Sequence, residues 1–89
     1  MFTGIIETLA EVVSLENQGS NINFSLKSDI ANEFKIDQSV SHNGVCLTVV
    51  DIDGNIYTVT AIKETLEKSN IGLLEIGDKV NLERSMKVG

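Results

Sequence analysis

The sequence predicts an all-β domain, a six-stranded antiparallel Greek-key closed barrel with two short helices. Apolar and polar residues alternate over short segments such as residues 22–26, and a period of two is typical of strands with one buried face. Pairs that form tight turns, such as Asn43-Gly44, separate these segments, and long amphipathic helical stripes are absent from the sequence. Closing the sheet removes exposed strand edges, which favours a barrel over an open sheet.

The expected strands are short and closely spaced. Asn43-Gly44, Asp53-Gly54-Asn55 and Gly77-Asp78 supply residues that tolerate positive φ, and we expect the first two to close hairpins between sequential strands. Residues 29–34 and 64–69 each have an apolar face and good helix formers, and are predicted to be one- or two-turn helices. The strands are expected over residues 4–13, 22–27, 38–42, 45–51, 56–62 and 79–84.

Length and composition limit the possible classes of function. A chain of 89 residues suffices for one domain with one hydrophobic core. Its 13 acidic and 7 basic residues give a formal net charge of -6, which disfavours nucleic acid and anionic membranes as partners. A single cysteine, Cys46, cannot close an intrachain disulfide and suits a reducing compartment, so we expect a cytoplasmic protein. No apolar run approaches the ~20 residues that a membrane helix needs.

Strand alternation predicts which side chains face outward. In the segment 45–50, Val45, Leu47 and Val49 form an aliphatic face that belongs inside. The opposite face, which points out, carries Cys46, Thr48 and Val50. In the next expected strand, residues 56–62, alternation likewise predicts three inward and three outward side chains. The inward set is Tyr57, Val59 and Ala61, and the outward set is Thr58, Thr60 and Ile62.

These faces predict a binding site on the outer wall. Because side chains fill the interior of a small barrel, a ligand must bind outside. Thr60 and Ile62 run into Lys63-Glu64-Thr65, where a short helix is expected to begin. Free N–H groups at a helix N-terminus can donate to a ligand carbonyl. The pattern is typical of a site for a planar heterocycle that carries carbonyl groups.

Each of these residues also has an ordinary structural interpretation. A lone cysteine on a strand is usually an inert small hydrophobe, threonine is a good strand residue, and Lys63 and Glu64 suit a solvated first helical turn. His42, the only histidine, lies beside the Asn43-Gly44 turn, where a polar residue needs no special explanation. No second histidine or cluster of cysteines accompanies it, so we expect no metal site.

Four separated segments resemble the first half of riboflavin synthase, in the same order and at the right separations. They are MFTGIIE at the start, HNGVCLTV in the centre, KETL after the fifth expected strand, and GDKVNLER near the end. The resemblance extends over residues 1–84. It implies that the chain is an N-terminal lumazine-binding barrel.

The resemblance also implies an activity and an assembly. Members of this family are expected to have two similar barrels and a C-terminal helix, to form homotrimers, and to build each active site between barrels of neighbouring subunits. They convert two molecules of 6,7-dimethyl-8-ribityllumazine to riboflavin and a pyrimidinedione, with no metal and no separate cofactor. The second barrel is absent from these 89 residues. We therefore expect this chain alone to bind the lumazine or riboflavin without turnover, and to form a homodimer.

The resemblance assigns two candidate catalytic residues and three stretches of ligand-contacting residues. Ser39 and Cys46 match positions with candidate catalytic roles toward the activated pteridine. The ligand-contacting positions carried over are Gly4, Ile5, Ile6, Cys46, Leu47, Thr48, Thr60, Ala61, Ile62, Lys63, Glu64 and Thr65.

Two other functions are compatible with a barrel of this kind. A non-enzymatic flavin binder of the lumazine protein type has the same two-barrel organisation, but Cys46 and the KETL segment favour the enzyme. An oligonucleotide-binding barrel needs a basic groove and stacking aromatic residues. This chain has a negative charge and only three Phe and one Tyr, so we rank nucleic-acid binding last.

Overall fold

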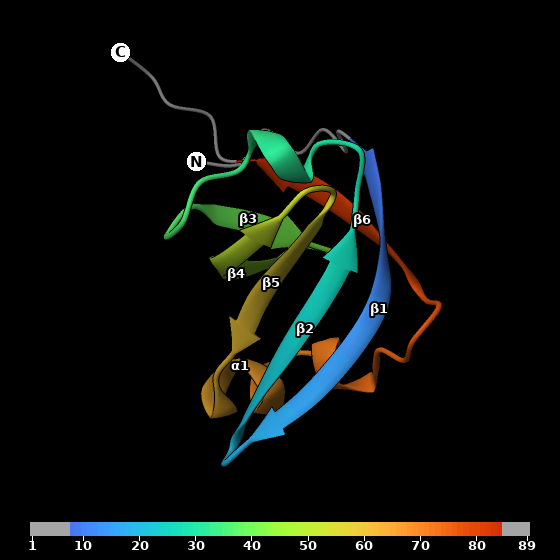
Figure 1. Ribbon diagram of the computed structural model, residues 1–89. Coiled ribbons are helices and arrows are strands. Elements are labelled where there is room, and N and C mark those ends of the chain that lie inside the picture. Colours follow the sequence, from blue (N-terminus) through green and yellow to red (C-terminus); the bar gives the residue numbers. More distant parts are fainter. Residues whose placement is uncertain (1–7, 85–89) are drawn as a thin grey trace.

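The computed structural model describes residues 8–84, and within them six antiparallel strands close a barrel (Figure 1). Around the barrel the strands follow the order β1-β2-β5-β4-β3-β6. Their bounds are β1 Thr8–Gln18, β2 Asn21–Lys27, β3 Ser39–His42, β4 Val45–Asp53, β5 Ile56–Ala61 and β6 Lys79–Arg84.

The strand order contains two overlapping Greek keys. Strands β3, β4 and β5 form a consecutive meander, while β2 pairs with β5 on one side of it and β6 pairs with β3 on the other. Each is the arrangement in which three hairpin-connected strands are joined by a fourth that returns from a longer connection. The predicted fold class is confirmed. Asn43 and Gly44 have φ values of 52° and 86°, as a two-residue hairpin turn between β3 and β4 requires.

Strand β1 differs most from its predicted bounds. We expected it to end at residue 13, but it continues to Gln18 and turns into β2 at Gly19, where φ is 63°. A bulge between Val12 and Ser14 shifts the register, and the residues beyond it are exposed. They therefore show no apolar alternation. The long, curved strand pairs with β6 through its first half and with β2 through its second (Figure 1).

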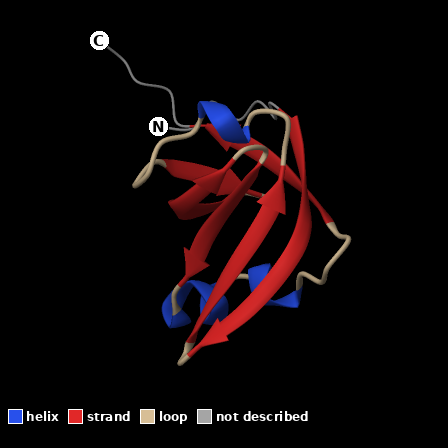
Figure 2. Ribbon diagram, in the orientation of Figure 1, coloured by secondary structure: helices blue, strands red, loops and turns tan. Residues whose placement is uncertain are grey.

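The helical segments cover the two ends of the barrel (Figure 2). The helix expected over residues 29–34 is only a 3-10 turn, η1 (Ala31–Glu33). The second expected helix corresponds to α1 (Lys63–Lys68), and an unpredicted 3-10 turn, η2 (Ile71–Leu73), follows it. Ala31 and Ile71 are fully buried, so each 3-10 turn is anchored to the core by one apolar side chain.

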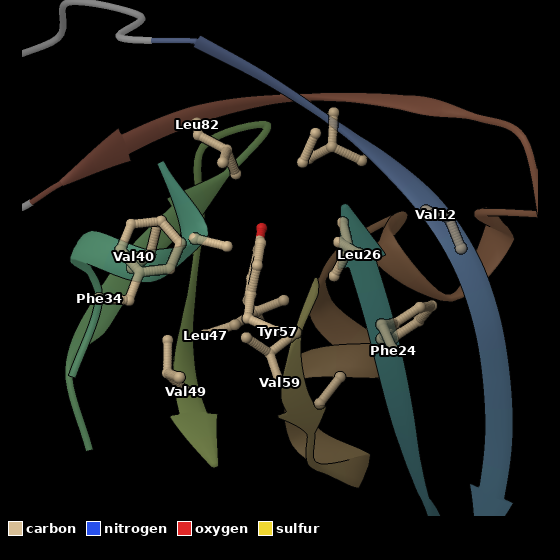
Figure 3. Close-up of a cluster of buried hydrophobic side chains, with 14 of the residues drawn as sticks. Val12, Phe24, Leu26, Phe34, Val40, Leu47, Val49, Tyr57, Val59 and Leu82 are labelled. Atoms are coloured by element: carbon tan, nitrogen blue, oxygen red, sulfur yellow. The ribbon is translucent and has the colours of Figure 1, made fainter. Parts of the chain in front are cut away.

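The core fills the inside of the barrel (Figure 3). Tyr57 lies in the middle of this cluster, with its ring edge-on to Phe34 at a centroid distance of 4.9 Å. Because these side chains fill the lumen, a ligand has no room inside the barrel. The buried apolar residues are Ala10, Val12, Phe24, Leu26, Ala31, Phe34, Val40, Leu47, Val49, Tyr57, Val59, Ala61, Ile71, Val80 and Leu82.

Candidate ligand site on the outer wall

The side-chain faces predicted for β4 and β5 are confirmed. Leu47 and Val49 are buried and Val45 packs against the core, whereas Cys46 and Thr48 are exposed. In β5, Tyr57, Val59 and Ala61 are buried. Thr58 and Thr60 are half-buried on the outer face, and Ile62, just after the strand, is exposed. The outer wall of these two strands is therefore available to a ligand.

Polar side chains form one continuous row across four strands of this wall. Ser39 on β3 lies opposite Thr48 on β4, Thr48 lies opposite Thr60 on β5, and Thr60 lies opposite Asn23 on β2. Side chains at directly opposed positions have Cβ atoms about 4.5–5.5 Å apart. We call Ser39, Thr48, Thr60 and Asn23 the polar row.

Side-chain hydrogen bonds connect the residues at the β5–β2 end of the polar row. The Thr60 hydroxyl donates to Asn23 Oδ1 at 2.7 Å, and Asn23 Nδ2 donates to Gln18 Oε1 at 3.0 Å. Two residues further along β2, Ser25 and Thr58 share a separate hydroxyl hydrogen bond of 3.0 Å. Asn23 was not among the site residues predicted from the sequence. The alternation in β2 places it outward, but only the pairing of β2 with β5 brings it to the site.

Ser39 and Cys46 lie on the same outer face without being directly opposite. Ser39 is opposite Thr48, and Cys46 is opposite Ser41, so the two predicted catalytic residues are diagonal neighbours. A separation of about 7–8 Å is typical of diagonal Cα atoms on a sheet. Ser39 also borders a groove of about 610 Å³, which is lined by Glu33, Lys35, Ile36, Asp37, Gln38, Ser39 and Arg84.

The end of β5 leads directly into helix α1. Ile62 has extended backbone angles and its carbonyl accepts the first helical bond, from the amide of Leu66 at 3.0 Å. The amides of a first helical turn have no intrahelical acceptor, and Ile62 has no side-chain acceptor to offer them. Lys63 and Glu64 are exposed and form (i, i+4) ion pairs within the helix, with Glu67 at 3.8 Å and Lys68 at 2.8 Å.

The remaining predicted ligand contacts fall into two groups. Leu47 and Ala61 point into the core, with exposed fractions of 3% and 0%, so only their main-chain atoms can face the outer wall. Gly4, Ile5 and Ile6 lie outside the described residues. Thr65 is half-buried in the first turn of α1.

His42 belongs to the core rather than to the polar surface of the neighbouring turn. Its Nδ1 donates to the carbonyl of Val40 at 3.0 Å, and its Nε2 accepts from the Tyr57 hydroxyl at 2.8 Å. The Val40 carbonyl requires a proton on Nδ1, and burial of the ring favours the neutral form, in which Nε2 is the acceptor. Burial lowers the pKa of His42 to about 4 and raises that of Tyr57. A role for His42 in contacting a ligand on the outer wall is therefore ruled out by its inward position.

Two classes of feature are absent from the described part of the chain. Residues 8–84 contain no group of three or more His, Cys, Asp or Glu side chains placed to hold a metal ion. The helices among them are also too short and too polar to cross a membrane.

The fold and the polar row together define a class of protein. This is a Greek-key barrel with a packed lumen and a row of polar side chains on its outer wall. The family model of the lumazine binding domain matches residues 3–85, and the chain therefore belongs to the lumazine-binding domain family.

The sequence is also similar to curated riboflavin synthases. It is 43% identical over 93 residues to the enzyme of Buchnera aphidicola subsp. Schizaphis graminum, covering 100% of this chain and 44% of that protein. It is 40% identical over 92 residues to the enzyme of Escherichia coli strain K12, covering 98% and 42%. For Bacillus subtilis strain 168 the identity is 39% over 87 residues, covering 97% and 40%. The chain thus spans less than half the length of these relatives.

Solved structures of LumP share the barrel. LumP complexed with 6,7-dimethyl-8-(1'-D-ribityl) lumazine superposes with a TM-score of 0.89 at 26% identity, covering 100% of this chain and 50% of LumP. LumP complexed with flavin mononucleotide gives a TM-score of 0.87 at 26% identity, covering 94% and 48%.

Proposed function

We propose that this chain binds 6,7-dimethyl-8-ribityllumazine and riboflavin on the outer wall of β4 and β5, as the N-terminal barrel of a riboflavin synthase. The observation that carries the proposal is the alignment of Ser39, Thr48 and Thr60 at opposed strand positions, in a domain of the lumazine-binding family. The riboflavin synthases to which the chain is similar, and the ligands bound to LumP, support the choice of ligand.

The wall offers each kind of contact that a pteridine or flavin needs. Hydroxyl groups of the polar row can meet the carbonyl and N–H groups at the ring edge. The first-turn amides of α1 add donors beside them. Ile62 and Val50, which are 51% and 44% exposed, supply apolar surface for the ring itself. A planar ring lying on the wall would cover this surface without entering the lumen.

Riboflavin titration tests this site directly. We expect the ligand's fluorescence to be quenched to saturation by the wild-type chain, and the affinity to fall about tenfold in Thr48→Val, because a ring carbonyl loses its donor. Cys46→Ala reports on the neighbouring exposed position. Ser14→Ala, which removes an exposed hydroxyl from β1, is the matched control and should bind as wild type. Equal affinity in wild type and Thr48→Val would contradict the proposed site.

Turnover is proposed to need more than this barrel. The reaction joins two lumazines, and holding both rings face to face raises their effective concentration. One outer wall holds one ring, so a second barrel must present the other. We expect riboflavin formation from a full-length protein with two barrels, and none above background from the 89-residue chain. Robust riboflavin synthesis by this chain alone would refute the proposal that turnover needs a second barrel.

A non-enzymatic role of the LumP type is the second candidate. The match to LumP complexed with the lumazine favours it, with a TM-score of 0.89. The identity to LumP is 26%, whereas the identity to the Escherichia coli riboflavin synthase is 40%, which supports the enzyme. A full-length protein that binds lumazine tightly and forms no riboflavin would favour the binder.

Self-association and a cytoplasmic location complete the proposal. Leu73 and Ile76 are 79% and 66% exposed, and a second copy of the chain could cover such apolar surface. Sedimentation should give the mass of a homodimer at micromolar concentration, and a monomer mass independent of concentration would count against it. The single cysteine supports a reducing, cytoplasmic environment.

A further inference from the structure

Thr60 and Thr48 are the two hydroxyl residues at the centre of the polar row, and they differ in their hydrogen bonds. The Thr60 hydroxyl already uses its proton in a hydrogen bond within the protein. It donates to Asn23 Oδ1 at 2.7 Å. Thr48, its opposed neighbour, makes no hydrogen bond to any side chain within residues 8–84. A hydroxyl carries one proton and two lone pairs. Thr48 can therefore donate or accept toward a ligand, whereas Thr60 can only accept.

Asn23 is itself held in the orientation that imposes this restriction. Its Nδ2 donates to Gln18 Oε1 at 3.0 Å, which directs the amide oxygen toward Thr60. Gln18 lies at the end of β1, Asn23 on β2 and Thr60 on β5, so the chain of bonds crosses three adjacent strands. In this series Thr60 donates to Asn23, and Asn23 donates to Gln18.

We infer that Asn23 is a positioning residue that makes Thr60 an obligatory acceptor, so that the site selects a ring edge with an N–H donor. In a flavin or a pteridinedione, that group is the imide N–H between two carbonyls. A ring that carries a methyl group on this nitrogen has no N–H to donate to Thr60, and the methyl group would clash with the Thr60 side chain. This inference rests on the proposed function, because it specifies how the same outer wall recognises its ligand.

The test compares riboflavin with its N3-methyl derivative. Titrations give two dissociation constants, and their ratio measures discrimination for the imide N–H. We expect wild type to bind riboflavin about tenfold more tightly than the N3-methyl ligand, since an unpaired acceptor opposes binding. In Asn23→Leu the Thr60 hydroxyl is free to turn its proton to the ligand, and the ratio should fall severalfold.

Two further variants separate positioning from a general structural effect. Asn23→Asp keeps an acceptor oxygen for Thr60, and the ratio should remain that of wild type. Ser25→Ala removes the neighbouring β2–β5 hydroxyl pair with Thr58, leaves Asn23 intact, and should leave the ratio unchanged. Comparison of ratios cancels any uniform loss of affinity caused by a loosened strand.

The possible failures are distinguishable. Equal binding of both ligands by wild type would overturn the assignment of Thr60 as the imide acceptor, while leaving the proposed flavin site intact. An unchanged ratio in Asn23→Leu would overturn the role of Asn23. If neither ligand binds the wild-type chain, the proposed function itself fails.

Discussion

The buried pair His42–Tyr57 makes the stability of the domain sensitive to acid. His42 is 1% exposed, and this burial disfavours the charged form of its ring. In the unfolded chain its pKa returns to 6.5, whereas in the folded chain the pKa is about 4. Between these two values the unfolded state binds a proton that the folded state does not. Stability is therefore fully present above pH 6.5 and is lost as the pH falls toward 4.

The pKa difference gives the size of the effect. One pKa unit corresponds to about 1.4 kcal/mol, so lowering the pKa from 6.5 to about 4 predicts a loss of about 3 kcal/mol of unfolding free energy. This is a large part of the stability of a small domain, which is typically about 5–15 kcal/mol.

The assay is urea unfolding at about pH 7.5 and about pH 4.5, on wild type and on His42→Gln. Glutamine can donate to the Val40 carbonyl and accept from Tyr57, but it does not titrate. Carboxylates contribute equally to the pH dependence of both proteins. We expect wild type to lose about 2–3 kcal/mol more than the variant on acidification. Parallel pH profiles for the two proteins would refute the reasoning.

Three further outcomes are expected from other parts of the barrel. Val59→Ala, at a fully buried position of the lumen, should lower the unfolding free energy by about 2 kcal/mol in urea denaturation, and an unchanged midpoint would contradict the packed core. Gly44→Ala forces a side chain into a turn residue with φ of 86°, and should cost about 1–2 kcal/mol without affecting ligand affinity. Cys46 is exposed and should react with a thiol reagent in the folded chain; saturating riboflavin should slow this labelling, and equal rates with and without ligand would count against its place beneath the ring.

Local alternation predicted most of the strands and the outward positions that the candidate site uses. The period-two pattern in β4 and β5 is enough to separate Leu47 and Val49 from Cys46 and Thr48, because each side chain of a strand faces opposite its neighbour. The Asn43-Gly44 turn could likewise be predicted from residues that tolerate positive φ. The end of β1 could not, because its exposed last residues beyond the bulge have no apolar face.

The sequence by itself determined the fold class, the inward and outward faces and the hairpins, since these depend on residues close together in the chain. The tertiary structure alone decided which strands became neighbours across long connections. It paired β2 with β5, which brought Asn23 to Thr60. It also buried His42, which the sequence places beside a turn, as a hydrogen-bond partner of Tyr57. Closure of the barrel is the physical reason, because it satisfies every strand edge at once and so depends on all six strands together.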